Sequence, residues 1–184
     1  MIVFLIGYRG AGKTTVAQRL ALELSCEWVD ADDEIELRAG RSIAAIFAEG
    51  GEAAFRAIET QVVDELSRRD HVVVALGGGA VLDAANREAL RRATADGAGR
   101  VVWLRGSAQQ LWRRIQADAL SSSRRPNLTA GGGIDEITAM LANRAPLYSE
   151  CAHLVVETDD KTPGEVADEI LAQLDGFVDR FRGA

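Results

Sequence analysis

The sequence is poor in cysteine, in histidine, in lysine and in long apolar runs. Its two cysteines, Cys26 and Cys151, lack the spacing of a metal site, and we expect reduced thiols in a cytoplasmic protein. Its two histidines, His71 and His153, adjoin predicted strand starts, and we expect them to be structural. No apolar run is long enough for a transmembrane helix, and the N-terminus lacks a basic lead. We therefore expect no membrane span, no signal peptide and no transit peptide.

Positive charge is also scarce, since 21 lysines and arginines face 28 aspartates and glutamates and give a net charge of −7. This balance disfavours a nucleic acid or an anionic membrane as a partner. The 184 residues are 47% hydrophobic and 27% charged, which predicts a single globular domain over 1–184. We expect a small-molecule substrate as the partner and a monomer as the oligomeric state.

Short apolar runs alternate with longer helical patterns, and this alternation predicts an α/β fold built on a parallel sheet. The candidate strands cover 2–6, 27–29, 72–75, 101–104 and 154–156. The candidate helices cover 13–24, 32–39, 42–69 with a break near Gly50-Gly51, 84–95, 108–118, 134–148 and 163–176. In such a sheet, ligands bind outside the carboxyl ends of the strands, so the residues that follow each strand are candidate site residues.

The first strand is followed by residues 7–14, GYRGAGKT, which fit the pattern G-x-x-x-x-G-K-[ST]. Between a strand and a helix, this pattern is typical of a phosphate-binding loop, because its backbone N–H groups and the helix N-terminus attract phosphates. Lys13 would reach the β- and γ-phosphates, and the hydroxyl of Thr14 would bind Mg²⁺. The candidate nucleotide-binding residues are Gly10, Ala11, Gly12, Lys13, Thr14 and Thr15. The alternative is a glycine-rich turn with a solvated lysine.

Aspartates follow the second predicted strand, and glycines, which leave the backbone uncovered, follow the third. Asp30 and Asp32 lie two residues apart, so one can face a metal ion and the other a substrate. The alternative is that one of them only caps the helix at 32–39. Residues 77–79 are three glycines, which would let a ligand lie directly on backbone N–H groups, and the alternative there is a flexible turn.

Three further segments carry arginine. Arg56 and Glu59, three residues apart on a predicted helix, belong either to a binding site or to a surface ion pair. Arg124 and Arg125 follow a serine-rich stretch and suit a mobile flap that excludes water and meets phosphate charge. The alternative for this pair is a solvated basic loop. Arg144, near a predicted helix end, is uninformative by itself.

Taken together, these motifs resemble those of the shikimate kinase family. The matching segments are G-x-x-G-A-G-K-T-T at 7–15, D-x-D at 30–32, G-x-S-I-x-x-I-F at 40–47, G-E-x-x-F-R-x-x-E at 51–59, G-G-G-A-V at 77–81, R-P at 125–126 and R-x-P-L-Y at 144–148. They run over nearly the whole chain in the family's order and spacing. The phosphate-binding loop alone would be generic, whereas the D-x-D, F-R-x-x-E and G-G-G segments in that order are specific.

The resemblance implies a three-layer P-loop kinase fold, with a five-stranded parallel sheet flanked by helices and a mobile lid. It also implies a substrate-binding helical subdomain at 32–61 and a lid at 113–130. The implied activity is the ATP-dependent phosphorylation of the 3-hydroxyl of shikimate, which yields shikimate 3-phosphate in chorismate and aromatic amino-acid biosynthesis. ATP would be the co-substrate and Mg²⁺ the metal ion.

The resemblance also implies roles for single residues. Arg56 and Arg144 would bind the shikimate carboxylate, and Asp32 would bind its hydroxyls. Asp30 would act on Mg²⁺ through water, beside Thr14. The implied catalytic residues are Lys13, Asp32 and Arg125, of which Arg125 would also meet the phosphates of the nucleotide, and Pro163 would lie near the adenine. The implied substrate-binding residues are Asp32, Phe47, Phe55, Arg56, Gly77, Gly78, Gly79 and Arg144.

The sequence departs from the family at Asn127, where a leucine is usual, and in a lid that is long and serine-rich. The division of roles between Arg124 and Arg125 therefore stays open. Two other functions also stay open at this point. One is a gluconate kinase or nucleoside monophosphate kinase of the same fold, against which the G-G-G and F-R-x-x-E segments favour shikimate. The other is a nucleotide-binding regulatory module without catalysis, from which we would expect the loss of at least one site residue.

Overall fold

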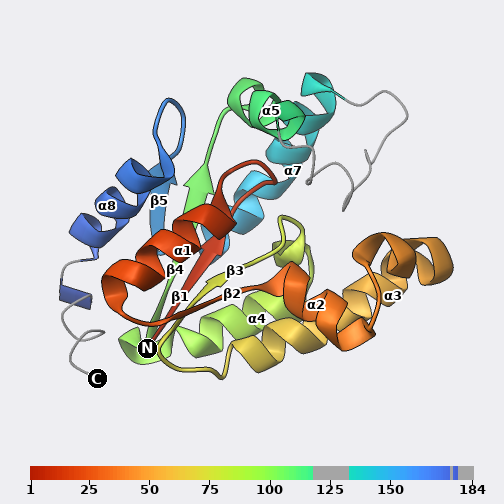
Figure 1. The fold of residues 1–184 in the computed structure, drawn as a ribbon, viewed down its shortest axis with the longest axis horizontal. Helices are drawn as coiled ribbons and strands as arrows, with labels where there is room; N and C mark the ends of the chain where they lie inside the picture. Colours follow the sequence, from red (N-terminus) through yellow and green to blue (C-terminus); the bar gives the residue numbers. More distant parts are fainter. Residues whose placement is uncertain (118–132, 175, 178–184) are drawn as a thin grey trace.

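The computed structural model describes residues 1–117, 133–174 and 176–177, and at its centre lies a sheet of five parallel strands (Figure 1). The strands are β1 (Ile2–Ile6), β2 (Glu27–Asp30), β3 (Val72–Ala75), β4 (Gly99–Arg105) and β5 (Leu154–Glu157). Their order across the sheet is β2-β3-β1-β4-β5, and every neighbouring pair is parallel. The carboxyl ends of all five strands therefore lie along one edge of the sheet.

The central strand β1 is buried on both faces of the sheet. Its side chains alternate, with Ile2, Phe4 and Ile6 in one apolar cluster and Val3 and Leu5 in the other. A strand that is covered on both sides must be apolar at every position, which explains why β1 reads as an unbroken apolar run. The sheet thus separates two apolar cores.

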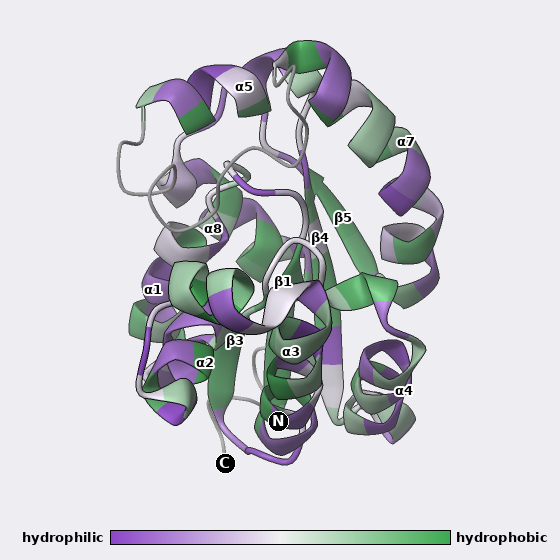
Figure 2. Cartoon of the chain, turned by 90° about the vertical axis from the view of Figure 1, so that its right-hand side faces the viewer, coloured by the Kyte–Doolittle hydropathy of each residue, from purple (hydrophilic) through white to green (hydrophobic). Residues whose placement is uncertain are grey.

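Helices cover both faces of the sheet and complete three layers (Figure 2). Helices α1 (Lys13–Leu24), α5 (Ala108–Ala117) and α8 (Pro163–Gln173) supply side chains to the core that contains Val3 and Leu5. Helices α2 (Ala31–Ala39), α3 (Ile43–Leu66) and α4 (Ala84–Ala93) supply the opposite core. Helix α7 (Ile134–Cys151) contributes to both, through Ile137 and Tyr148. This arrangement is the predicted three-layer α/β fold.

The predicted bounds hold without change for β1, α1 and β3 and differ by a few residues elsewhere. The predicted break near Gly50-Gly51 is a kink inside α3, where Gly51 has φ 68° and ψ −170°. Helix α7 continues through Pro146 and ends at Cys151. Two short 3₁₀ helices, η1 (Ala80–Leu82) and η2 (Ala95–Gly97), were not predicted from the sequence.

The predicted lid at 113–130 lies mostly outside the described residues. Only 113–117 are described, and they form the last part of α5. Arg124, Arg125 and Asn127 fall outside the described part of the chain, and so does the question of how Arg124 and Arg125 share their roles. The predicted subdomain at 32–61 corresponds to most of α2 and most of α3, and its binding role stays a prediction.

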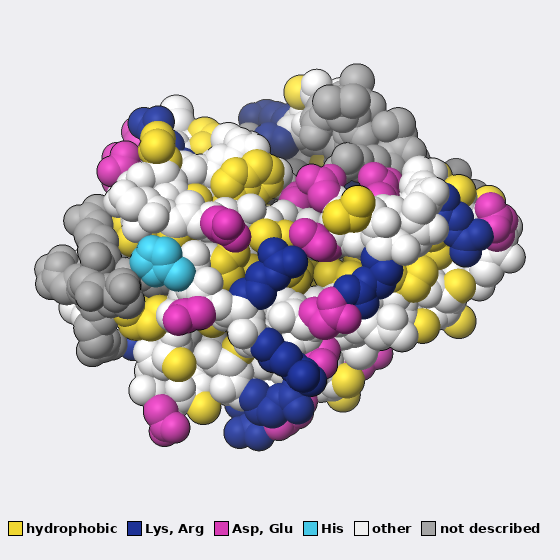
Figure 3. All heavy atoms as spheres, turned by 60° about the horizontal axis from the view of Figure 1, so that its bottom comes forward, with side chains coloured by type: hydrophobic (Ala, Val, Ile, Leu, Met, Phe, Trp, Pro, Cys, Tyr) yellow, Lys and Arg dark blue, Asp and Glu magenta, His cyan; other side chains and the backbone are white. Residues whose placement is uncertain are grey.

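Basic and acidic side chains are interspersed on the face of the molecule shown in Figure 3. The ion pairs of the described residues include Asp64 with both Arg68 and Arg92, and Arg91 with Glu88. Among the described helices, none has the length and apolar character that crossing a membrane requires.

Candidate functional site

The loop between β1 and α1, residues 7–14, curls because glycines take backbone conformations that other residues avoid. Gly10 and Gly12 have φ values of 80° and 85°. Gly7 also has a positive φ, 140°, and a Cβ there would lie 2.4 Å from the carbonyl oxygen of Leu104 on β4. Only a glycine fits against β4 at this point. The sequence and the packing therefore agree on a phosphate-loop geometry, and we call these residues the P-loop.

Lys13 folds back over the P-loop from the first turn of α1. Its Nζ donates hydrogen bonds to the carbonyl oxygens of Gly7 (2.9 Å) and Tyr8 (3.0 Å). The N-cap of α1 is Gly12, which has no side chain to cap the helix, and the first turn contains no acidic residue. The N–H groups and the partial positive charge of this helix end therefore suit an anion.

Asp30 connects the P-loop to the helix that carries Asp32. The hydroxyl of Thr14 donates to Asp30 Oδ2 at 2.6 Å, while Asp30 Oδ1 accepts from the backbone N–H of Asp32 at 2.9 Å. Asp30 is the N-cap of α2. The two interpretations of Asp30 from the sequence, helix cap and site residue, are therefore compatible, because one oxygen serves each.

Arg144 is a buried guanidinium in the middle of the site. The residue is 7% exposed, and Nη1 donates to the carbonyl oxygen of Gly78 at 3.1 Å. Its other recorded contacts are the sulfur of Met140, 4.0 Å from Nη2, and the ring of Tyr8, whose centroid lies 5.4 Å from Cζ. Among the described residues, no carboxylate forms an ion pair with Arg144. A buried positive charge that rests on neutral groups alone is costly, so this position suits an anionic ligand.

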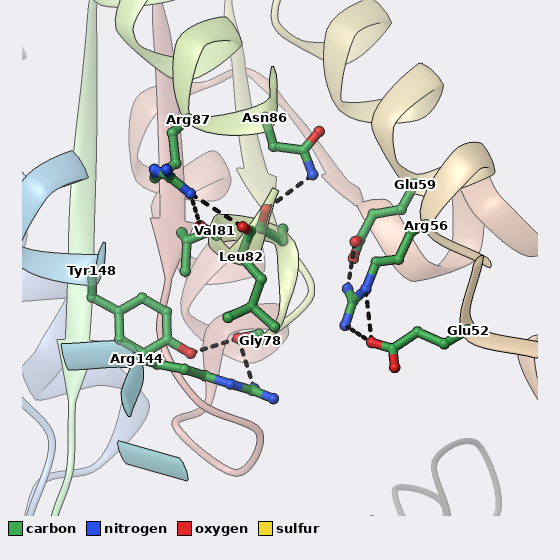
Figure 4. Close-up of polar contacts among 11 residues, drawn as sticks. Glu52, Arg56, Glu59, Gly78, Val81, Leu82, Asn86, Arg87, Arg144 and Tyr148 are labelled. Carbon is green, nitrogen blue, oxygen red and sulfur yellow. Dashed lines mark hydrogen bonds and ion pairs between the residues drawn. The ribbon is translucent and has the colours of Figure 1, made fainter. Parts of the chain in front are cut away.

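Arg56 approaches the same glycines, residues 77–79, from α3 (Figure 4). A Cβ on Gly79 would lie 2.7 Å from Arg56 Nη2, so the guanidinium rests on bare backbone. Unlike Arg144, Arg56 is held by carboxylates: Nη1 donates to Glu59 at 2.5 Å and Nη2 to Glu52 at 3.1 Å. Burial lowers the pKa of Arg56, but Glu59 and Glu52 more than offset this, and the pKa lies above its usual range.

We call residues 77–79 the glycine loop, and it packs directly on the P-loop. A Cβ on Gly78 would lie 3.2 Å from both the backbone nitrogen of Arg9 and the carbonyl oxygen of Gly7. The structure thus brings the predicted phosphate-binding loop, Arg56 and Arg144 to one place, on either side of the glycine loop.

Two aromatic rings of α3 extend the candidate site beside Arg56. The rings of Phe47 and Phe55 stack with centroids 4.9 Å apart. The kink at Gly51 lies between them in the sequence and lets the two halves of α3 bring the rings together. Phe55 is fully buried and Phe47 is half-buried. One aromatic edge is therefore available beside Arg56, whose guanidinium lies 5.2 Å from the centroid of the Phe55 ring.

A family model described as shikimate kinase matches residues 9–175 of the chain. The chain belongs to the shikimate kinase family. A shikimate kinase of Pseudomonas syringae pv. tomato is 43% identical over 94% of this chain and 95% of its own length. One from Rhodopirellula baltica is 41% identical over 92% of this chain and 88% of its own length. The solved structure of the Acinetobacter baumannii shikimate kinase in complex with shikimate superposes with a TM-score of 0.86, at 36% identity, and covers 95% of this chain and 93% of that one.

Pro163, which the family resemblance places near the adenine, lies at the first position of α8. It lies inside a capping box, in which Thr162 and Glu165 on either side of it bind each other's backbone N–H groups. Proline at this helix position has a structural explanation of its own. Its predicted contact with the adenine stays a prediction, and so does the role of Arg125, which lies outside the described residues.

Sequence reasoning missed several residues that hold the site together. Tyr148 donates from its hydroxyl to the carbonyl oxygen of Gly78 at 2.6 Å, beside Arg144. Asn86 and Arg87 of α4 bind the 3₁₀ helix that follows the glycine loop. Tyr148 could have been found as the last residue of the R-x-P-L-Y segment. No local sequence signal points to Asn86 or Arg87.

Cys26, His71 and His153 directly precede β2, β3 and β5, at the edge of the sheet opposite to these loops, and Cys151 ends α7. Burial raises the pKa of both thiols to about 11, with Glu27 and Glu150 as the next causes for Cys26 and Cys151. His153 Nδ1 accepts the backbone N–H of Val101 at 3.2 Å. Within the described residues, His, Cys, Asp and Glu side chains form no cluster of three or more that could hold a metal ion.

Proposed function

We propose that this chain transfers the γ-phosphoryl group of ATP to the 3-hydroxyl of shikimate, giving ADP and shikimate 3-phosphate for chorismate biosynthesis. The observation that carries the proposal is Arg144, a buried guanidinium with neutral partners among the described residues, one loop away from the P-loop. A buried guanidinium of this kind suits an acceptor with an anionic group. Shikimate supplies one carboxylate on a small ring with three hydroxyls.

The carboxylate would be bound by Arg144 and Arg56 together. Two guanidinium groups can donate several charge-assisted hydrogen bonds to one carboxylate and fix its plane. Glu59 and Glu52 hold Arg56 in place, whereas no carboxylate in the described part of the chain pairs with Arg144. Orientation of the ring then follows from the direction of the carboxylate and from the apolar edge of Phe47.

The hydroxyls would be bound by Asp32 and by the N–H groups of Gly78 and Gly79. A carboxylate is a natural acceptor for two adjacent hydroxyls, and Asp32 can also take the proton of the attacking one. The transition state of phosphoryl transfer is loose, so orientation of that hydroxyl matters more than early removal of its proton. Capping of α2 by Asp30 fixes the backbone on which Asp32 stands.

The phosphates would be bound by the backbone of residues 10–15 and by Lys13. The Thr14 hydroxyl and the Asp30 carboxylate converge at 2.6 Å, and hard oxygen donors of this kind suit Mg²⁺. Thr14 would bind the ion directly and Asp30 through water, and the bound ion would supply positive charge to the β- and γ-phosphates. Lys13 would stabilise charge on the transferring group.

The protein is proposed to act as a cytoplasmic monomer. Two free thiols with raised pKa values fit a reducing compartment. A single chain also holds both predicted halves of the site. Sedimentation of the purified protein with and without shikimate tests the monomer, and a stable dimer would contradict it.

A coupled assay of ADP release tests the reaction, with shikimate, gluconate and the common nucleoside monophosphates as separate acceptors. We expect ADP release that requires shikimate, ATP and Mg²⁺. Release with gluconate or a nucleoside monophosphate but not with shikimate would assign a different kinase. Nucleotide binding without turnover of any acceptor would support a regulatory module instead.

A further inference from the structure

The carbonyl groups that follow Gly77 are bound from outside the loop by two helices (Figure 4). Tyr148 and Arg144 of α7 both donate to the carbonyl oxygen of Gly78, at 2.6 and 3.1 Å. Asn86 Nδ2 of α4 donates to the carbonyl oxygen of Ala80 at 2.9 Å. Since a trans peptide directs its C=O and N–H groups in opposite directions, binding the Gly78 carbonyl also sets where the N–H of Gly79 points.

Arg87 forms the largest part of this support. Its Nη1 donates to the carbonyl oxygens of Val81 and Leu82, at 2.8 and 3.2 Å. Its Nε lies 3.4 Å from Glu150 Oε1 at the end of α7. One side chain therefore ties η1 to α4 and, more loosely, to α7. The Arg87 side chain is 21% exposed, so most of it is packed away from water.

A loop of three glycines needs such support. Glycine loses more conformational freedom on folding than any other residue, so the glycine loop does not define its own shape. Strand β3 ends at Ala75 and fixes the loop on one side. On the other side the chain continues into η1, a single 3₁₀ turn that the bonds from α4 hold in place. Displacement of η1 would displace Gly79, on which the Arg56 guanidinium rests.

We propose that Arg87 is a positioning residue for the acceptor site: by binding the Val81 and Leu82 carbonyls, it holds the glycine loop in the shape that Arg56 and Arg144 need. This inference rests on the proposed function, because it concerns the same acceptor site. It goes beyond that function by assigning a role to α4, a helix that supplies no residue to the proposed binding of either substrate.

Arg87→Met tests the proposal, with Arg91→Met as its matched control. Arg91 lies one turn later on α4, pairs with Glu88 and has a side chain that is 71% exposed. Both variants remove one positive charge from the same helix, but only Arg87 contacts η1. We expect Arg87→Met to raise the KM for shikimate about tenfold and to change the KM for ATP less than about twofold. Arg91→Met should leave both values at those of the unsubstituted protein.

A second measurement does not depend on turnover. Hydrogen exchange of the ligand-free protein should be faster across 77–83 in Arg87→Met than in Arg91→Met, because local opening of η1 becomes easier. Arg87→Lys, which keeps the charge but lacks the separate Nε donor that faces Glu150, should lie between the two.

The outcomes separate the inference from the proposed function. Equal shikimate KM values in Arg87→Met and Arg91→Met would overturn the inference, and so would a parallel rise of both KM values, which indicates general loosening. Absence of faster exchange at 77–83 would overturn it whatever the acceptor. If the unsubstituted protein does not phosphorylate shikimate, the proposed function fails, and the exchange experiment still decides on Arg87.

Discussion

The proposed acceptor site has two sides, which we call the α3 arm (Arg56 with Glu52 and Glu59) and the α7 arm (Arg144 with Met140). The two arms hold their arginines in opposite ways. On the α3 arm, Arg56 is paired with Glu59, which is 1% exposed, and with Glu52 near the surface. On the α7 arm, Arg144 is more deeply buried, and its recorded contacts are a carbonyl, a sulfur and an aromatic ring. The first arm is electrically compensated without a ligand. The second one is not compensated by any described carboxylate.

This difference predicts that one arginine contributes to the stability of the fold and the other mainly to the affinity for the substrate. A buried ion pair broken on one side leaves a charge that destabilises the fold, whereas removal of an uncompensated buried charge relieves the fold. Arg56 should therefore matter to folding as well as to binding, and Arg144 should matter mainly to binding. Substitutions on the two arms ought to be separable in one pair of measurements, activity and thermal stability.

Substitution of Arg144 should have the largest effect on activity. Arg144→Met removes the charge that meets the carboxylate, and we expect kcat/KM for shikimate to fall at least about 100-fold. The melting temperature should stay the same or rise, because methionine fills much of the volume without a charge and Tyr148 still binds Gly78. Steady-state kinetics and a thermal melt measure both. A melting temperature well below that of the unsubstituted protein would contradict the proposed difference between the two arms.

Substitution of Arg56 should cost less activity and more stability. Arg56→Met leaves the Glu59 carboxylate buried without Arg56, and we expect unfolding to become easier by about 2 kcal/mol. We expect kcat/KM for shikimate to fall about 30-fold. The double variant Arg56→Met with Glu59→Gln is the control: it should regain most of the stability but none of the activity. Urea denaturation of the three proteins gives the free energies, and no recovery in the double variant would remove Glu59 from the explanation.

Substitution of Gly79 displaces one arm without removing a charge. Gly79 has an ordinary φ of −103°, so alanine fits the backbone there, but its Cβ would lie 2.7 Å from Arg56 Nη2. Because the guanidinium can move aside, we expect stability to change by less than about 1 kcal/mol while the KM for shikimate rises about tenfold. Gly164→Ala is a matched control, since the nearest contact of its Cβ is 3.9 Å away. An unchanged KM in Gly79→Ala would show that Arg56 does not need its present position.

The smallest effect is expected far from both arms, at His153. Burial lowers the pKa of His153 below 6.5, and Arg100 adds to this. The unfolded chain then binds more protons than the folded one between the lowered pKa and 6.5, so this contribution to stability is complete above pH 6.5 and is lost as the pH falls through that window. His153→Asn keeps an acceptor for the N–H of Val101 and should flatten the profile by a few tenths of a kcal/mol. Denaturation between pH 5 and 8 measures it, and activity at pH 8 should not change.

Much of the fold follows from local patterns, and much of the site does not. Strand β1, helix α1 and strand β3 were predicted residue by residue, because glycines bound short apolar runs and a helical period follows the P-loop. Strand β4 begins at Gly99, two residues before the predicted start, because the sheet pairs Gly99 with Ile2. Pairing between distant strands leaves no mark in the local sequence.

Strand order likewise explains what could be predicted about the site. The residues after β1, β2 and β3 could be placed at one edge of the sheet in advance, since parallel strands end there together. The partner of Arg56 could be predicted in part, because Glu59 lies three residues later on the same predicted helix. The partners that the described residues give Arg144 could not, because Gly78, Met140 and Tyr8 come from three different segments.

Gly78 sets the spacing between the P-loop and the glycine loop, which are the proposed phosphate and acceptor sites. Its Cα stands against main-chain atoms of Gly7 and Arg9, so a methyl group there would lie 3.2 Å from two of them and would crowd the P-loop. Donor and acceptor loops are therefore kept apart by peptide units alone, which neither change rotamer nor vary in length between side chains. In the proposed reaction, the backbone would therefore set the distance that the phosphoryl group crosses, and changes in the surrounding side chains could alter the choice of acceptor without altering that distance.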